Sequence, residues 1–338
     1  MRVCLLGDFT GRPDEGMKNI SMAIRDMLSI KHNVLALNSR EVLTKKFFRK
    51  IRLLRPEMIH YLHGPTIRSL IILKVVKYLS GSRPKTIISA TRPYFSIYSW
   101  WAVTLFKPDL LFTQSSGFED FFKKKGCQVE FLPNGVDCDK FNSINETEKL
   151  SLRKQFNLLE DKKIVLHVGH IKANRNLEIF KKIQKLPNIQ VIIIGGTTEK
   201  ADENIKKDLE KSGVKVFHKY FEDISQFYKM SDLYIFPVKD SGNKLPISYN
   251  QVGAIDLPLS VMEAMACNLP VITTPFGALS RLFKSGDGLF FCETEEEIIY
   301  VIQQLSYKGE IATRDKVLPH DWRKVIKRLE KIYQEIVL

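Results

Sequence analysis

Hydrophobic positions form short continuous runs along the chain, and longer segments between them repeat apolar residues at helical spacing. We expect each short run to be a buried strand and most of the intervening segments to be helices. The first six runs cover residues 3–6, 33–37, 58–61, 86–89, 110–113 and 129–132. The next six cover residues 164–168, 191–194, 214–217, 233–236, 270–273 and 289–291.

This alternation predicts an α/β protein with parallel sheets. Two sets of six strands in 338 residues fit two doubly wound, Rossmann-like domains. The charged segment 142–161 has weak periodicity and marks the division, with a short helix expected inside it. The tail from Asp321 predicts an amphipathic helix, since Trp322, Val325, Leu329 and other apolar residues share one face.

The net charge of +14 favours anionic partners, which include nucleic acid, a membrane surface and anionic substrates. Within residues 40–55, the six basic residues from Lys45 to Arg55 alternate with apolar ones, as in helices that lie on anionic membranes. An ordinary surface helix with a solvated charged face explains the pattern equally well. Trp100 and Trp101 suit either a membrane interface or a core. Apart from the charge, nothing indicates nucleic-acid binding.

Five scattered cysteines without CxxC spacing indicate a reducing compartment and argue against structural zinc. No apolar run is long enough to span a bilayer, and the first apolar run is too short for a signal peptide. We expect a cytoplasmic protein, with the basic segment holding it peripherally at the inner face of the membrane.

Candidate chemistry concentrates in residues 253–279. Apolar spacing predicts a helix with Pro258 in its first turn and Asn268 in the left-handed position after its end, followed by a buried strand. Glu263 is the carboxylate within this helix. A carboxylate beside a helix start and a glycine turn suits a nucleotide-sugar pocket. A plain helix–strand unit with a solvated glutamate is the alternative.

Several motifs occur in an order that resembles the retaining glycosyltransferases of the GT-B fold, most closely the large family 4 of nucleotide-sugar-dependent enzymes. They are LPNGVDCDKF (132–141), HVGHIKANRNLEIF (167–180), VIIIGG (191–196), MSDLYIFPV (230–238) and PLSVMEAMACNLPVIT (258–273). The resemblance covers nearly the whole length. It implies two Rossmann-like domains facing a cleft, an acceptor-side domain (1–150), a donor domain (151–318), and a C-terminal helix (319–338) that packs back toward the first domain.

The resemblance also implies roles for particular residues. Glu263 would bind the donor ribose, while Arg175 and His170 would hold the diphosphate, although the family has Arg and Lys at those two positions. The remaining donor-side candidates are Gly16, Gly195, Gly196, Phe276, Gly277 and Ala278. His63 and Arg92 follow predicted strands on the acceptor side. His60 is expected to be a hydrogen-bonded strand residue without a catalytic role.

The sequence departs from the family pattern near the start of residues 253–279. The family carries two glutamates across this loop and helix, and Ile255 occupies the position of the first. Asp256, the next residue, can replace that carboxylate after a shift by one residue. Asp256 also suits a helix N-cap, and the two roles do not exclude each other.

The resemblance therefore implies a retaining hexosyltransferase that moves sugar from a nucleoside diphosphate sugar to an acceptor hydroxyl. The basic, aromatic first domain favours a lipid-linked or cell-surface glycan acceptor, and a soluble sugar or polysaccharide primer is the alternative. The Asp137-Cys138-Asp139 string is a DxD sequence, but it follows an Asn-Gly turn, and we expect no metal and no cofactor. The alternatives are a catalytically degenerate nucleotide-sugar-binding or scaffold protein, and a nucleotide-sugar epimerase of the same fold.

Overall fold

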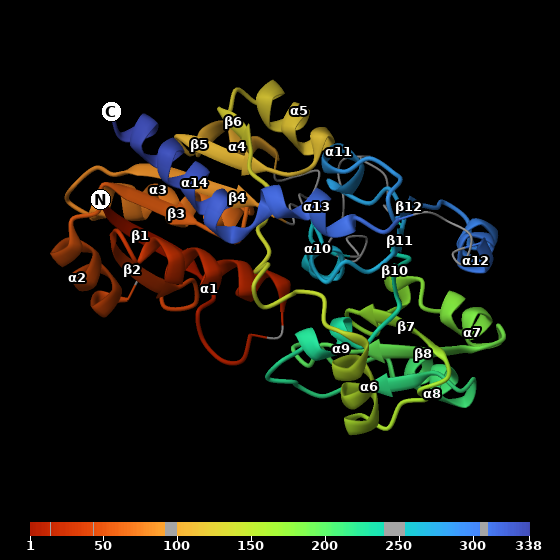
Figure 1. Ribbon diagram of the computed structural model, residues 1–338. Helices are drawn as coiled ribbons and strands as arrows, with labels where there is room; N and C mark the ends of the chain where they lie inside the picture. The colour runs from red at the N-terminus through yellow and green to blue at the C-terminus, as the bar shows by residue number, and fades with distance from the viewer. Residues whose placement is uncertain (14, 43, 92–99, 240–253, 305–309) are drawn as a thin grey trace. The chain divides into compact units, whose positions relative to one another are not determined.

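All twelve predicted strands are present in the computed structural model, which describes residues 1–13, 15–42, 44–91, 100–239, 254–304 and 310–338 (Figure 1). Contacts divide the chain into two compact units. Unit 1 contains Met1–Gly135, Ser241–Leu257 and Trp322–Leu338, and unit 2 contains Val136–Asp240 and Pro258–Asp321.

The first crossing between the units follows Gly135, earlier than the boundary at residue 150 expected from the charged segment. Side-chain hydrogen bonds explain why the segment after Gly135 belongs to unit 2. The Arg314 guanidinium donates to the carbonyl oxygens of Cys138 and Phe141, each at 2.9 Å. The C-terminal helix belongs to unit 1.

Unit 1 is built on a six-stranded parallel sheet in the order β2-β1-β3-β4-β5-β6. Its strands are β1 (Arg2–Gly7), β2 (Asn33–Asn38), β3 (Met58–Tyr61), β4 (Lys85–Ala90), β5 (Leu110–Thr113) and β6 (Val129–Phe131). Its helices are α1 (Gly16–Leu28), α2 (Lys45–Leu54), α3 (Ile67–Leu79), α4 (Trp100–Leu105), α5 (Ser116–Lys124) and α14 (Trp322–Val337).

Helices cover both faces of the unit 1 sheet. Apolar residues of α2, α3, α4 and α5 form one core with alternate residues of the strands. On the opposite face, α1 and α14 pack together (Figure 1). His60 lies on this second face, where its ring nitrogens hydrogen-bond to the Tyr333 hydroxyl at 2.5 Å and the Ser89 hydroxyl at 2.7 Å. Burial lowers the pKa of His60 to about 3, so this histidine is a neutral structural residue, as expected from the sequence.

Unit 2 contains a second six-stranded parallel sheet, in the order β12-β11-β10-β7-β8-β9. Its strands are β7 (Lys163–Val168), β8 (Ile189–Ile194), β9 (Lys215–Phe217), β10 (Leu233–Phe236), β11 (Val271–Thr273) and β12 (Leu289–Phe291). Its helices are α6 (Glu146–Gln155), η1 (Ala173–Arg175), α7 (Ile179–Gln184), α8 (Glu203–Lys211), α9 (Ser225–Lys229), α10 (Leu259–Ala266), α11 (Leu279–Leu282), α12 (Glu295–Gln304), α13 (Thr313–Val317) and η4 (Leu318–His320).

In each sheet, the order in which the chain adds strands reverses at one position, and such positions commonly bind ligands. In unit 1 the chain moves from β1 to the edge strand β2 and returns to β3, so the reversal lies between β1 and β3. In unit 2 the reversal lies between β7 and β10. Open parallel sheets bind ligands outside the carboxyl ends of the strands at such reversals, because the flanking loops diverge there. Each unit therefore offers one expected binding position.

The segment containing Glu263 has the expected helix and strand, α10 and β11. Asn268 is in the left-handed region with φ of 56°, as predicted for the residue that ends this helix. Pro258, not Asp256, is the N-cap of α10. The interpretation of Asp256 as that cap is therefore wrong, since Asp256 lies two positions before the cap residue.

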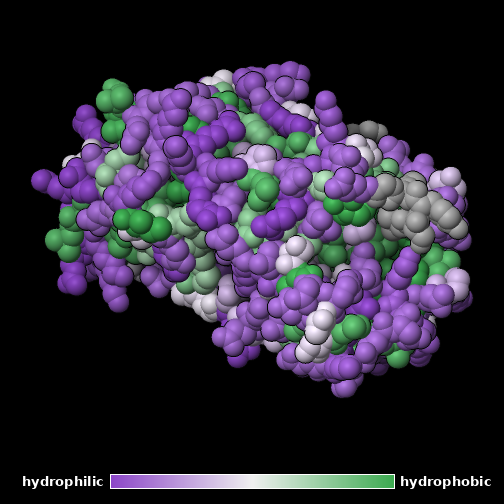
Figure 2. Space-filling model, in the orientation of Figure 1, coloured by the Kyte–Doolittle hydropathy of each residue, from purple (hydrophilic) through white to green (hydrophobic). Residues whose placement is uncertain are grey.

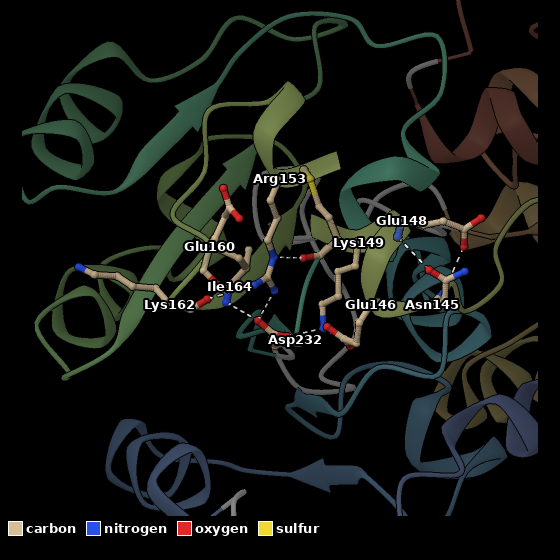
Figure 3. A network of polar contacts seen from close by, with 10 residues as sticks. Asn145, Glu146, Glu148, Lys149, Arg153, Glu160, Lys162, Ile164 and Asp232 are labelled. Atoms are coloured by element: carbon tan, nitrogen blue, oxygen red, sulfur yellow. Dashed lines mark hydrogen bonds and ion pairs between the residues drawn. The ribbon is translucent and has the colours of Figure 1, made fainter. Parts of the chain in front are cut away.

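A buried ion-pair network fixes α6 to the sheet of unit 2 (Figure 3). Arg153 is 5% exposed, and its guanidinium lies 2.6 Å from an Asp232 carboxylate oxygen. Asp232 also pairs with Lys149 at 2.6 Å and accepts from the Ile164 amide at 2.7 Å. The network holds α6 against the first residues of β7 and β10.

We expect Arg153→Met to lower the free energy of unfolding of unit 2 by about 3 kcal/mol. The change leaves a partly buried Asp232 with only Lys149 as its ionic partner. Urea denaturation measures the loss. The neighbouring Lys154→Met is the control, because Lys154 pairs with Glu160 at 3.7 Å with both side chains exposed, which is worth about 0.5 kcal/mol. Equal losses in the two variants would contradict this account of the network.

Candidate functional site

Glu263 projects from α10, whose other faces are almost entirely buried. One carboxylate oxygen accepts a 2.7 Å hydrogen bond from the Tyr228 hydroxyl. Burial raises the pKa of Glu263 to about 7, and the Tyr228 hydrogen bond and the charge of Lys140 oppose that rise. The Glu263 side chain is partly buried, so a hydrogen bond to its second carboxylate oxygen is stronger than the same bond in water.

Tyr228, in α9, was not among the residues singled out from the sequence. Its side chain is fully buried, with ring centroids 5.5 Å from Phe141 and 5.7 Å from Tyr234. Burial and the Glu263 charge raise its pKa well above 10, so the hydroxyl stays protonated and donates. Packing on two rings fixes that hydroxyl and, through it, the orientation of the Glu263 carboxylate.

Arg175 ends the short helix η1 in the loop after β7 and is 8% exposed. A Cβ atom placed on Gly169 would lie 3.6 Å from an Arg175 guanidinium nitrogen. The guanidinium therefore lies against the glycine turn at the carboxyl end of β7, beside the reversal of the sheet. His170 follows Gly169 in the same loop and is partly buried.

The charges of Arg175 and Glu263 both influence the buried side chain of Tyr234. Its ring is fully buried in β10, and its hydroxyl donates to the Val168 carbonyl at the end of β7, at 3.4 Å. Burial raises the pKa of Tyr234, the negative charge of Glu263 raises it further, and the positive charge of Arg175 lowers it. Both charges thus act on the same buried ring, at the expected binding position of unit 2.

His167, the penultimate residue of β7, is a second residue that sequence reasoning missed. Its Nδ1 donates to the Ile235 carbonyl at 2.9 Å, so Nε2 is the acceptor nitrogen. Nε2 is buried without a hydrogen-bond partner among the described residues and lies 3.1 Å from the Cβ position of Gly169. Burial lowers the pKa of His167 to about 4, and the charge of Arg175 adds to this, so the ring is neutral.

The two predicted glycine turns require glycine for different reasons. A Cβ on Gly195 would lie 2.9 Å from Ile171 and 3.1 Å from His218, so packing inside the protein already requires glycine there. The Gly196 carbonyl accepts from His218 at 3.2 Å. Gly277 has φ of 56°, a conformation that favours glycine. It separates the buried residues Phe276 and Ala278, which anchor the turn after β11.

Asp256 and Glu263 belong to different units of the chain. Asp256 is 7% exposed, its amide donates to the Thr91 carbonyl at 2.9 Å, and it belongs to unit 1. Glu263, in contrast, belongs to unit 2. Arg92 lies outside the described residues.

Unit 1 has a polar pocket of about 230 Å³ at the reversal between β1 and β3. Its lining residues are Gly7, Asp8, Thr10, Glu15, Met17, Lys18, Asn38, Ser39, Arg40 and His63. The ring of His63 hydrogen-bonds to the Ser21 hydroxyl at 2.8 Å, and burial lowers its pKa. Lys18, 9% exposed, lies 3.9 Å from Asp8. Gly16 begins α1 between the lining residues Glu15 and Met17.

No group of three or more His, Cys, Asp or Glu side chains among the described residues is arranged to hold a metal ion. In the DxD string, the Asp137 carboxylate accepts from the backbone amides of Asp139 and Lys140 at 3.1 and 2.9 Å. Asp137 thus stabilises a turn.

Comparison with solved structures identifies the architecture as the GT-B fold of glycosyltransferases. HepE of Anabaena, crystallised in complex with UDP and glucose, superposes with a TM-score of 0.71 at 15% identity, and the match covers 99% of each chain. Residues 148–314 match the family described as glycosyl transferases group 1. The match covers 167 of the 338 residues, just under half of the chain, and shows that this part is similar to the group 1 glycosyltransferases.

Two curated relatives match with moderate identity. The sulfoquinovosyl transferase SQD2 of Arabidopsis thaliana is 26% identical over 213 residues, which are 58% of this chain and 38% of SQD2. The alpha-galactosylglucosyldiacylglycerol synthase of Streptococcus pneumoniae is 24% identical over 157 residues, 43% of this chain and 37% of the synthase. The chain thus spans less than two thirds of the length of these relatives.

Proposed function

We propose that this protein transfers a hexosyl group from a nucleoside diphosphate sugar to an acceptor hydroxyl with retention of configuration. The observation that carries the proposal is the partly buried Glu263 carboxylate, oriented by Tyr228 in the same unit as the buried cation Arg175. The group 1 family match and a relative named as a sulfoquinovosyl transferase support it.

The donor would be held by three kinds of contact in unit 2. Glu263 accepts hydrogen bonds from the ribose hydroxyls through the oxygen that Tyr228 leaves available. Arg175 binds the diphosphate with two parallel hydrogen bonds, a geometry that a planar guanidinium favours. His170 and the turn at Phe276, Gly277 and Ala278 complete the phosphate side, and Gly195 and Gly196 line the approach of the nucleotide.

Catalysis in this proposal is electrostatic. As the glycosidic bond breaks, negative charge grows on the leaving diphosphate, and fixed cations stabilise it. No nucleophilic side chain is assigned, so the acceptor hydroxyl attacks from the face that the leaving phosphate occupies, and that phosphate accepts the hydroxyl proton. Asp256 is the candidate carboxylate for the position that Ile255 vacates. Cationic neutralisation of the diphosphate makes a metal ion unnecessary.

The acceptor in this proposal is a lipid-linked or cell-surface glycan at the cytoplasmic face of the membrane. A relative named as a diacylglycerol-glycolipid synthase supports a lipid acceptor. The polar pocket of unit 1 offers His63 and Lys18 to a sugar hydroxyl or phosphate of the acceptor.

Donor affinity should fall as the pH decreases through 7. The pKa of Glu263 is about 7, and only the carboxylate accepts hydrogen bonds from both ribose hydroxyls. At pH 8 about a tenth of Glu263 is protonated and at pH 6 about nine tenths, so the Kd for a nucleotide sugar should rise about tenfold between them. Calorimetric titration measures this change. Glu263→Gln should bind weakly with no such pH dependence, and the same pH dependence in that variant would contradict the assignment.

Radiolabelled nucleotide sugars, supplied as a panel with membranes and followed by lipid extraction, test the proposed reaction. Label in an organic-soluble glycan is the expected result. Free sugar of altered configuration would indicate an epimerase, and binding without turnover would indicate a catalytically degenerate binding protein.

A further inference from the structure

The positive charge of the protein belongs almost entirely to unit 1. This unit contains 28 Lys and Arg against 13 Asp and Glu, whereas unit 2 contains 24 against 25. A donor site for a diphosphate in unit 2 therefore does not account for the basic character of the chain. A separate anionic partner of unit 1 does account for it.

Within unit 1, the charge concentrates on one layer of helices. Together α2, α3 and α4 contain eight Lys and Arg residues and no Asp or Glu. Lys45, Lys46 and Arg49 are exposed, and none of them pairs with a carboxylate among the described residues. We call the outward surface of these three helices the α2–α4 face.

The same face exposes large apolar side chains. Ten such side chains are exposed among the described residues, and six of them lie on α2, α3 and α4: Leu53, Ile71, Tyr78, Leu79, Trp101 and Leu105. Leu53 is 78% exposed and Leu105 63%. At the left of Figure 2, where α2 lies, hydrophobic residues reach the surface between hydrophilic ones. The apolar residues of α2 that do face the sheet, Phe47 and Ile51, are already buried, so folding within unit 1 does not require Leu53.

A groove of about 470 Å³ joins the charged and apolar residues. It is lined by Lys45, Phe48, Arg49, Arg52, Leu53 and Leu79. The Arg52 guanidinium donates to the Leu79 carbonyl at 3.2 Å, which links α2 to the end of α3. The groove thus has leucine and phenylalanine side chains within a rim of cations.

We propose that the α2–α4 face docks the protein on an anionic lipid bilayer, with the cations at the headgroups and Leu53 and Leu79 in the acyl boundary. Basic residues alternating with exposed apolar ones complement such a surface in both charge and polarity. A nucleic acid would pair with the cations through its phosphates, but it would leave the aliphatic side chains exposed to water. No helix among the described residues is long and apolar enough to cross a bilayer.

Cosedimentation of the full chain with vesicles tests this proposal without any substrate, so its outcome is independent of the proposed reaction. The vesicles contain phosphatidylcholine and phosphatidylserine in a ratio of about 3:1, and pure phosphatidylcholine vesicles serve as the comparison. We expect binding to the anionic vesicles that weakens with added salt, and binding at least about tenfold weaker to the neutral ones.

Variants then locate the surface. The combination Lys45→Gln, Lys46→Gln and Arg49→Gln should weaken binding to anionic vesicles about a hundredfold, because each lost charge costs roughly a factor of five. The matched control Lys206→Gln, Lys207→Gln and Lys211→Gln removes the same charge from α8 of unit 2 and should change binding less than about twofold. The pair Leu53→Ser and Leu79→Ser, which keeps the charge, should weaken it about tenfold.

Three results would overturn the proposal. One is a wild-type protein that does not bind the anionic vesicles. Another is an equal loss of binding in the α8 control, which would mean that net charge alone is responsible. The last is binding of duplex DNA as tightly as vesicles, with the leucine variant unaffected, which would make nucleic acid the partner of this face.

Discussion

Glu263→Ala is expected to weaken binding of a nucleoside diphosphate sugar by at least about a hundredfold. A carboxylate that accepts hydrogen bonds contributes about 1.5–3 kcal/mol for each, and two ribose hydroxyls would lose theirs. Isothermal titration calorimetry measures the affinity directly. Because Tyr228 donates to the same carboxylate, alanine also leaves a buried hydroxyl without its partner, so thermal unfolding of the variant must be measured alongside.

Two further variants separate ribose recognition from folding. Glu263→Gln keeps an acceptor for Tyr228 and should retain the fold while losing most of the donor affinity. Glu210→Ala, on the exposed face of α8, should bind the donor as the wild type does. Donor affinity unchanged in Glu263→Ala would show that the ribose is bound elsewhere.

Arg175→Ala is expected to reduce kcat by about a hundredfold or more. The guanidinium is the buried cation at the carboxyl end of β7, where the leaving diphosphate would develop its charge. Removing one preformed donor to a charge that grows in the transition state typically costs about 3–4 kcal/mol. Initial rates at saturating donor measure kcat separately from KM.

Neighbouring substitutions test the specificity of this effect. Arg175→Lys keeps the charge but loses the paired hydrogen bonds, so kcat should lie between those of the wild type and the alanine variant. Lys172→Ala removes a partly exposed cation of the same loop that pairs loosely with Glu199 at 3.9 Å, and kcat should change less than about threefold. A larger effect at Lys172 than at Arg175 would assign the diphosphate to the outer part of the loop.

The sequence predicted the strands well because each is a short apolar run between polar segments, and all twelve are present. It predicted a basic helix within residues 40–55, which is present at Lys45–Leu54, and a C-terminal helix, because apolar residues share one face in both segments. The division of the chain was harder. The charged segment around residue 150 has the composition of a linker, but buried Arg153 attaches its helix to unit 2, and backbone carbonyls at Cys138 and Phe141 bind Arg314.

The candidate site was only partly predictable. Glu263 is a carboxylate among apolar residues, which singles it out in the sequence, and Arg175 was singled out by the family resemblance. Tyr228 and His167 lie in apolar stretches where an aromatic ring or a neutral histidine reads as core, and both are indeed buried. Their polar atoms matter because of distances that only the fold creates, 2.7 Å from Tyr228 to Glu263 and 3.1 Å from His167 to the Gly169 position. For Trp101 the sequence left a core position and a membrane-interface position open, and the side chain is exposed.

The central claim is that the protein transfers sugar from a nucleotide donor with retention. The most direct test uses a nucleotide sugar that the protein turns over in the panel assay. Proton NMR then compares the anomeric coupling constant of the product with that of the donor. The account predicts a glycoside with the same anomeric configuration as the donor, formed by the wild type and not by Glu263→Ala. A glycoside of inverted configuration, or free epimerised sugar without a glycoside, would contradict it.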